Sequence, residues 1–253
     1  MKTSLGPQDI NALLAPLTDA EQRFARHFPG ETAARQPVHT VYGGAHLFKA
    51  GTAKKLGDLG LRALATYAPD PFAFARAIDL PGSQTLPSSL AEAESVAKAV
   101  RENPELARRT HRHAALAVVL YDRIKEKLAR EPIEDYRIDF EDGYGNRPDA
   151  EEDGHAVAAA DETAKGMAEQ VLSPFVGIRV KPLSAELRTR SIRTLDLYVT
   201  ALSEKTGGKL PENFVVTLPK VMMPEQIVTL RGLFDALEKK TGLAPGALKM
   251  ELM

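Results

Sequence analysis

The sequence predicts an α/β protein, and two observations support this fold class. Strand-like segments begin near Tyr136, Phe175 and Phe214, at equal spacing along the chain, and another begins near Ala247. Between them, apolar residues recur every three to four positions, as they do on one face of an amphipathic helix. Strands that alternate with such helices at a fixed period indicate repeated βα units and a parallel sheet.

Two architectures are built from such units, the doubly wound sheet and the (β/α) barrel. The glycine-rich dinucleotide fingerprint and the Walker phosphate loop are both absent from the sequence, which favours the barrel. A closed barrel needs eight strands, whereas five can be counted here, the first of them at Val38–Tyr42. We therefore predict a single TIM-type barrel domain over residues 1–253 that is incomplete and C-terminally truncated.

Three regions follow one another in this prediction. Leading helices occupy residues 1–36, before the first strand. Residues 49–130 have a helical pattern and form an insertion after that strand. Within the insertion, an apolar stripe at four-residue steps indicates a long helix, and its members are Leu116, Leu120, Ile124 and Leu128. The repeated βα units then occupy residues 136–253.

Composition excludes several classes of function. The net charge is −1, so bulk electrostatics favour neither nucleic acid nor an anionic membrane. The basic cluster of Arg108, Arg109 and Arg112 has no interleaved aromatic residues and is interpreted as a solvated helix face, with His111 and His113 on the surface. The chain has no cysteine, which excludes disulfides and thiolate metal sites, and no apolar run of membrane-spanning length. We expect a soluble cytoplasmic protein.

Charged residues gather at the ends of the predicted strands, where barrel enzymes assemble their sites. In the strand that begins at Tyr136, Ile138 and Phe140 share one face, and Asp139 and Glu141 share the other. Carboxylates with an arginine and no thiols indicate a hard cation such as Mg²⁺ and an anionic substrate held by the guanidinium. In chain order, the residues at the strand ends are His46, Asp139, Glu141, Asp142, Arg179, Lys181, Lys220 and Glu251.

Each of these residues also has a purely structural explanation. The three carboxylates after Ile138 could cap the next helix or face solvent. His46, after a Gly-Gly turn, could be a general base, or its imidazole could bind a loop carbonyl. Lys220 could be a surface lysine, and Lys181 is expected to be one. Arg179 has apolar neighbours on both sides in its strand and faces away from them, which favours a site residue.

The motifs at the strand ends resemble those of the aldolase/citrate lyase superfamily. This group comprises the citrate lyase β-subunit-like and HpcH/HpaI-type proteins, whose fold is a TIM barrel that binds phosphoenolpyruvate or pyruvate. The resemblance covers roughly residues 136–253, and the helical segment 49–130 has no counterpart in the compact citrate lyase β-subunits. The motifs are Asp139-Phe140-Glu141-Asp142-Gly143, Ile178-Arg179-Val180, Leu218-Pro219-Lys220-Val221 and Met250-Glu251.

The resemblance implies roles for individual residues. Glu251 would be the first carboxylate ligand of Mg²⁺, and Arg179 would hold the substrate carboxylate or an enolate oxygen. Asp139, Glu141 and Asp142 would hold metal-bound waters and orient the ligands. The second metal carboxylate of the family, an aspartate at the end of the next strand, would lie beyond residue 253.

The implied function is that of a Mg²⁺-dependent carbon–carbon lyase or aldolase. It would act through an enolate on a small 2-oxo or hydroxy acid or on its CoA thioester, as a homo-oligomer when full length. Arg179, Glu141, Asp142 and His46 are the expected catalytic residues, and Arg179 and Lys220 the expected substrate-binding residues. Two alternatives stay open: phosphoenolpyruvate-dependent phosphoryl transfer, for which His46 is the available nucleophile, and a non-catalytic fragment or binding protein.

Overall fold

The computed structural model describes residues 3–31 and 33–253, which divide into two compact units. The first unit, residues 1–36, contains helix α1 (Pro7–His27). A proline at the start of α1 suits the helical φ angle, and the Asp9 carboxylate accepts a hydrogen bond from the backbone N–H of Gly6, the N-cap residue. Near its end, the rings of Phe24 and Phe28 lie 4.9 Å apart. No residue of α1 is buried.

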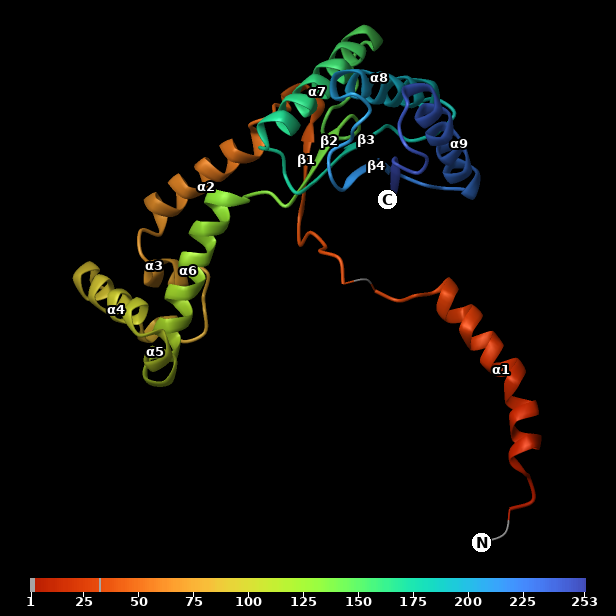
Figure 1. Cartoon of the computed structure of the whole chain (residues 1–253). Coiled ribbons are helices and arrows are strands. Elements are labelled where there is room, and N and C mark those ends of the chain that lie inside the picture. The colour runs from red at the N-terminus through yellow and green to blue at the C-terminus, as the bar shows by residue number, and fades with distance from the viewer. Residues whose placement is uncertain (1–2, 32) are drawn as a thin grey trace. The chain divides into compact units, whose positions relative to one another are not determined.

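The second unit, residues 37–253, is built on a sheet of five parallel strands in the order β1-β2-β3-β4-β5 (Figure 1). The prediction of an α/β protein with a parallel sheet is therefore confirmed. The sheet is open, with β1 and β5 at its two edges, so the closed form of a barrel is not seen. The strands are β1 (Thr40–Gly44), β2 (Asp135–Asp139), β3 (Phe175–Arg179), β4 (Phe214–Leu218) and β5 (Lys249–Leu252).

Three helices that follow the central strands pack against one face of the sheet (Figure 1). They are α7 (Asp149–Glu169), α8 (Arg188–Thr206) and α9 (Pro224–Thr241). Ile138 and Ile178 on the strands meet Tyr198 and Phe234 on the helices, and all four side chains are fully buried. A side chain at Gly177 in β3 would place its Cβ 2.2 Å from the carbonyl oxygen of Val215, so this strand contact requires glycine.

A helical lobe, residues 52–130, lies between β1 and β2 in the sequence. It has its own core, in which Phe72, Ala97, Ala117 and Val118 are buried. The predicted stripe does lie on a helix, but the stripe residue Leu116 is 48% exposed, and alanines and Val118 form much of the buried face. The lobe consists of α2 (Thr52–Tyr67), α3 (Pro71–Ala77), α4 (Leu90–Glu102), α5 (Pro104–Thr110) and α6 (Arg112–Arg130).

Helices of membrane-spanning character are not found in the part of the chain that the structure describes, since none is both long and apolar enough.

Candidate functional site at the carboxyl ends of the strands

The face of the sheet opposite α7, α8 and α9 carries polar and charged side chains. Strand pairing aligns Asp139 with both Gly44 and Arg179, and Thr217 with both Arg179 and Glu251, so these residues form a row across the sheet. A row below it is formed by Tyr42, Arg137 and Gly177 in register. Several polar and charged side chains on this face are buried, which requires that they pair with one another. With Asp135, which lies two residues before Arg137 on β2, the buried members are Arg137, Asp139, Arg179 and Thr217.

Arg179, at the end of β3, is fixed by Asp139 at the end of β2. The guanidinium donates from Nε to Asp139 Oδ1 at 2.8 Å and from Nη2 to Oδ2 at 2.6 Å, a bidentate arrangement. The same group lies 4.5 Å from the centre of the Tyr42 ring, in cation–π geometry. Its remaining nitrogen, Nη1, lies 3.2 Å from Glu141 Oε2. Arg179 therefore faces away from the apolar core, as predicted, and is held rigidly.

The Asp139 carboxylate also accepts backbone hydrogen bonds from Glu141 at 2.9 Å and Gly143 at 2.7 Å. Burial alone would raise the pKa of this carboxyl, but the hydrogen bonds from Arg179 and the two backbone N–H groups lower it below its ordinary value. The hydrogen bond to Asp139 in turn raises the pKa of Arg179, against the effect of burial. Both groups are ionised, so the acidic strand end serves to orient the arginine.

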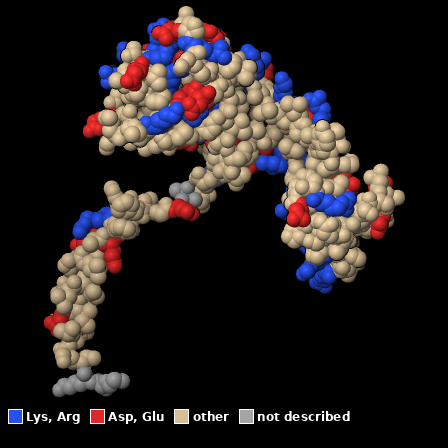
Figure 2. Space-filling model, turned by 180° about the vertical axis from the view of Figure 1, so that it is seen from behind, with Lys and Arg blue, Asp and Glu red and all other residues tan. Residues whose placement is uncertain are grey.

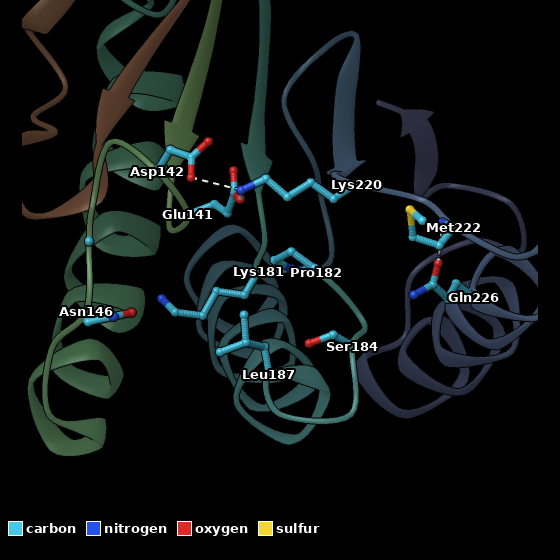
Figure 3. Close-up of a pocket in the computed structure, with 11 residues that line it drawn as sticks. Glu141, Asp142, Asn146, Lys181, Pro182, Ser184, Leu187, Lys220, Met222 and Gln226 are labelled. Carbon is cyan, nitrogen blue, oxygen red and sulfur yellow. Dashed lines mark hydrogen bonds and ion pairs between the residues drawn. The ribbon is translucent and has the colours of Figure 1, made fainter.

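Glu141 and Asp142 contact Lys220, which follows β4 (Figure 3). The Lys220 ammonium lies 3.0 Å from Asp142 Oδ1 and contacts Glu141 Oε1 as well. A hydrogen bond from Lys220 lowers the pKa of Asp142, although partial burial opposes this shift. Lys220 has a φ of 54°, a left-handed conformation that is uncommon for a side chain of this size and is often found at functional sites.

A pocket of about 520 Å³ opens beside these three charged residues. Figure 3 shows Lys220 reaching from the end of β4 across to Asp142, with Ser184 and Gln226 on other elements around the opening. The pocket joins charged, polar and apolar side chains, which suits a small polar ligand. Its lining residues also include Asn146, Lys181, Pro182, Leu187 and Met222.

Glu251, on β5, is bound by Arg137, a residue that the sequence analysis did not single out. Arg137 donates to the two Glu251 oxygens at 3.2 and 3.0 Å, and Thr217 donates to Oε2. Arg137 also pairs with Asp135, two residues before it on β2. Burial would raise the pKa of Glu251, but the hydrogen bonds from Arg137 and Thr217 lower it, so Glu251 is ionised. Side chains two residues apart in a strand lie on the same face, so the pattern that predicted the face of Asp139 also predicts the face of Arg137.

His46 lies in a different environment from the other predicted site residues. It follows β1 in a short 3₁₀ turn, and its ring lies 5.6 Å from that of Tyr144 and 6.1 Å from that of His155. Its Nδ1 is buried and has no hydrogen-bond partner among the described residues, and burial, with Arg147 nearby, lowers its pKa. His46 is not among the residues that line the pocket beside Lys220.

The expectation that Lys181 is a surface residue is wrong. Its side chain is buried, and its ammonium donates to the Phe140 carbonyl at 2.6 Å and to Glu152 Oε2 at 2.8 Å. Glu152, on α7, is completely buried and needs a cation beside it. The Lys181 ammonium also lies 5.0 Å from the centre of the Tyr144 ring. Lys181 thus links β3 to α7 while lining the pocket.

Glu251 is the residue that best fits the role of an oxygen ligand for Mg²⁺. It is ionised, its side chain is 37% exposed, and Oε1 keeps a lone pair beyond its bond to Arg137. Mg²⁺ commonly takes only one or two protein carboxylates and completes its shell with water and substrate oxygens. Within residues 3–31 and 33–253, no three acidic or histidine side chains are gathered as a metal-binding group.

A family model described as "Domain of unknown function (DUF6986)" matches residues 17–253. Neither the curated proteins nor the solved structures contain a significant match to the chain.

Proposed function

We propose that this chain, which belongs to the DUF6986 family, is a Mg²⁺-dependent carbon–carbon lyase or aldolase whose parallel sheet forms part of a (β/α) barrel. It would act on a small 2-oxo or hydroxy acid, or on its CoA thioester, through an enolate. The observation that carries this proposal is the Arg179 guanidinium, held at the carboxyl end of β3 by Asp139 and Tyr42. A fixed cation at this position in a parallel α/β sheet suits a carboxylate or enolate oxygen.

Arg179 can bind substrate because Asp139 occupies only Nε and Nη2. Nη1 lies 3.2 Å from a Glu141 carboxylate oxygen and donates a weak hydrogen bond to the Met253 sulfur at 3.7 Å. A substrate oxygen that replaced the weak contact to sulfur would gain a charge-assisted hydrogen bond. Since Asp139 already fixes the guanidinium, little reorganisation is needed when negative charge develops on that oxygen.

Glu141 is the residue best placed to move a proton. Its side chain is 5% exposed and lies between the Arg179 and Lys220 cations, yet its Oε2 atom accepts no hydrogen bond of good geometry from the described residues. A substrate held by Arg179 Nη1 would lie next to this oxygen. Lys220 would then contact a second anionic or polar group of the substrate in the adjoining pocket. Asp142 holds Lys220 in place.

When bound, Mg²⁺ would supply Lewis-acid stabilisation of the developing enolate oxygen. Glu251 would hold the ion from this chain, and Arg137 and Thr217 fix the orientation of that carboxylate. Phosphoryl transfer has less support, because His46 packs on Tyr144 and His155 and does not line the pocket.

Oxalate, which mimics a pyruvate enolate, tests the binding role of Arg179 by isothermal titration in the presence of Mg²⁺. Removing the charge-assisted donor Nη1 with Arg179→Gln should weaken oxalate binding by about thirtyfold or more. Asp139→Asn should weaken oxalate binding less, because the guanidinium remains but is no longer held by the Asp139 carboxylate. Arg231→Gln, which removes an exposed arginine paired with Asp235 on α9, is the matched control and should bind like the wild type. Equal affinity of the wild type and Arg179→Gln would refute the proposed site.

A further inference from the structure

The helical lobe contains a second pocket, of about 600 Å³, whose lining includes two arginines and two histidines. Arg109 and Arg112 line it together with His111 and His113, and Glu92 is the one acidic residue among its lining side chains. Lys and Arg side chains are visible on the surface of this lobe in Figure 2. We propose that this pocket binds the phosphate group of a phosphate ester whose other part is a small apolar or ring group. The proposal does not depend on the lyase function.

The pocket keeps a positive charge, because its two arginines outnumber the one carboxylate, Glu92, in its lining. Two arginines of the lobe have close carboxylate partners: Arg101 makes two hydrogen bonds of 2.8 Å to Asp122, and Arg108 contacts Glu105 at 2.7 Å. Arg109 and Arg112, by contrast, form no ion pair with any carboxylate in the described ranges. Two guanidinium groups without counter-charges beside one cavity favour an anion there, and arginine is the side chain best suited to the oxygens of a phosphate.

The walls of this pocket are fixed by specific contacts. Arg112 donates from Nε to His113 Nε2 at 3.2 Å, which leaves its terminal nitrogens for a ligand. The His113 ring packs against Gly82, where a Cβ would lie 2.2 Å from Nδ1 and where φ is 80°. The lining residue Pro87 accepts a hydrogen bond from Arg76 through its carbonyl oxygen at 2.8 Å. Arg112 and His113 are therefore held in place at the edge of the pocket.

An apolar groove of about 260 Å³ adjoins the basic pocket, and the two share Val96, Thr110 and His111 as lining residues. Val100 and Leu106 add apolar surface to the groove. A bare phosphate ion would use the basic pocket alone and leave this surface in water. A phosphate ester can use both, with its anionic group at the arginines and its apolar or ring part in the groove, which is why we assign the site to an ester.

The test is isothermal titration of the full chain with ADP, hexyl phosphate and inorganic phosphate. At least one ester should bind, and inorganic phosphate should bind at least about tenfold more weakly because it leaves the groove empty. The double variant Arg109→Gln/Arg112→Gln should weaken ester binding by about tenfold or more. The control, Arg108→Gln/Arg123→Gln, removes the same charge from exposed positions of the same two helices outside the pocket and should retain the affinity. Leu106→Ser should weaken binding of the ester and leave that of inorganic phosphate unchanged.

Three results would overturn the proposal. One is the absence of binding by either ester at millimolar concentration. Another is an equal loss of affinity in the two double variants, which would show a general effect of charge. The third is inorganic phosphate binding as tightly as both esters, which would remove the role of the groove. Circular dichroism of each variant checks the fold, and all the substituted arginines are exposed.

Discussion

Replacement of Arg137 by methionine should strongly destabilise the sheet, because it leaves a buried carboxylate without its cation. The side chains of Arg137 and Asp135 are 5% and 2% exposed. Without Arg137, the Thr40 hydroxyl, at 2.8 Å, is the remaining hydrogen-bond donor to Asp135 in the described part of the chain. Glu251, the other partner of Arg137, is 37% exposed and can be solvated by water instead. Removing one partner of a buried ion pair costs about 3–5 kcal/mol, so we expect Arg137→Met to lower the unfolding free energy by that amount.

The assay is urea unfolding followed by far-ultraviolet circular dichroism. Arg101→Met is a matched control, since Arg101 pairs with Asp122 with similar two-bond geometry but with side chains 48% and 42% exposed. This exposed pair should contribute no more than about 1 kcal/mol. The double variant Asp135→Asn/Arg137→Met, which removes the uncompensated charge, should recover part of the loss. A single Arg137→Met variant as stable as Arg101→Met, or a double variant no more stable than that single one, would refute the reasoning.

Two further predictions concern the strands. Gly177→Ala should lower the unfolding free energy by about 2–3 kcal/mol, because its Cβ would lie 2.2 Å from the Val215 carbonyl oxygen. The control is Gly232→Ala on α9, where an added Cβ meets nothing within 4 Å. Equal stability of the two variants in urea would contradict this account of the packing. The pKa of Asp139 is lowered from 3.8, so its stabilisation is complete above about pH 4 and is lost as the pH falls through the folded-state value. The unfolding free energy of the wild type should therefore fall more steeply below pH 4 than that of Asp139→Asn, and identical pH slopes would show that this carboxyl contributes nothing.

Local sequence patterns predicted the βα units well. The strands at Phe175 and Phe214 begin where the sequence places them, since short β-branched and aromatic runs between turn signals have few alternatives. The long helix of the lobe shows the limit of the same method. Its leucine stripe indicated a helix correctly, yet Leu116 is exposed, because the burial of a face depends on which helices pack against it. Small residues such as Ala117 allow that close packing, and no hydropathy pattern emphasises them.

The candidate site was predicted in part. Because parallel strands end at the same edge, Asp139 and Arg179 could be expected to lie close together, and they form a bidentate pair. The roles of Arg137 and Lys181 were missed, since each depends on a partner far away in the sequence: Glu251 for one and Glu152 for the other. Spacing along the chain carries no information about such pairs. The pocket beside Lys220 likewise arises from loops whose course follows from packing.

The central claim, that this site stabilises an enolate, is tested most directly by proton exchange. Pyruvate is incubated with the protein and Mg²⁺ in D₂O, and loss of its methyl proton signal is followed by nuclear magnetic resonance. We expect the wild type to accelerate exchange over Mg²⁺ in buffer, and Arg179→Gln and Glu141→Gln to lose that acceleration while Arg231→Gln retains it. Exchange in the wild type no faster than in buffer with Mg²⁺, or undiminished exchange in Arg179→Gln, would contradict the claim.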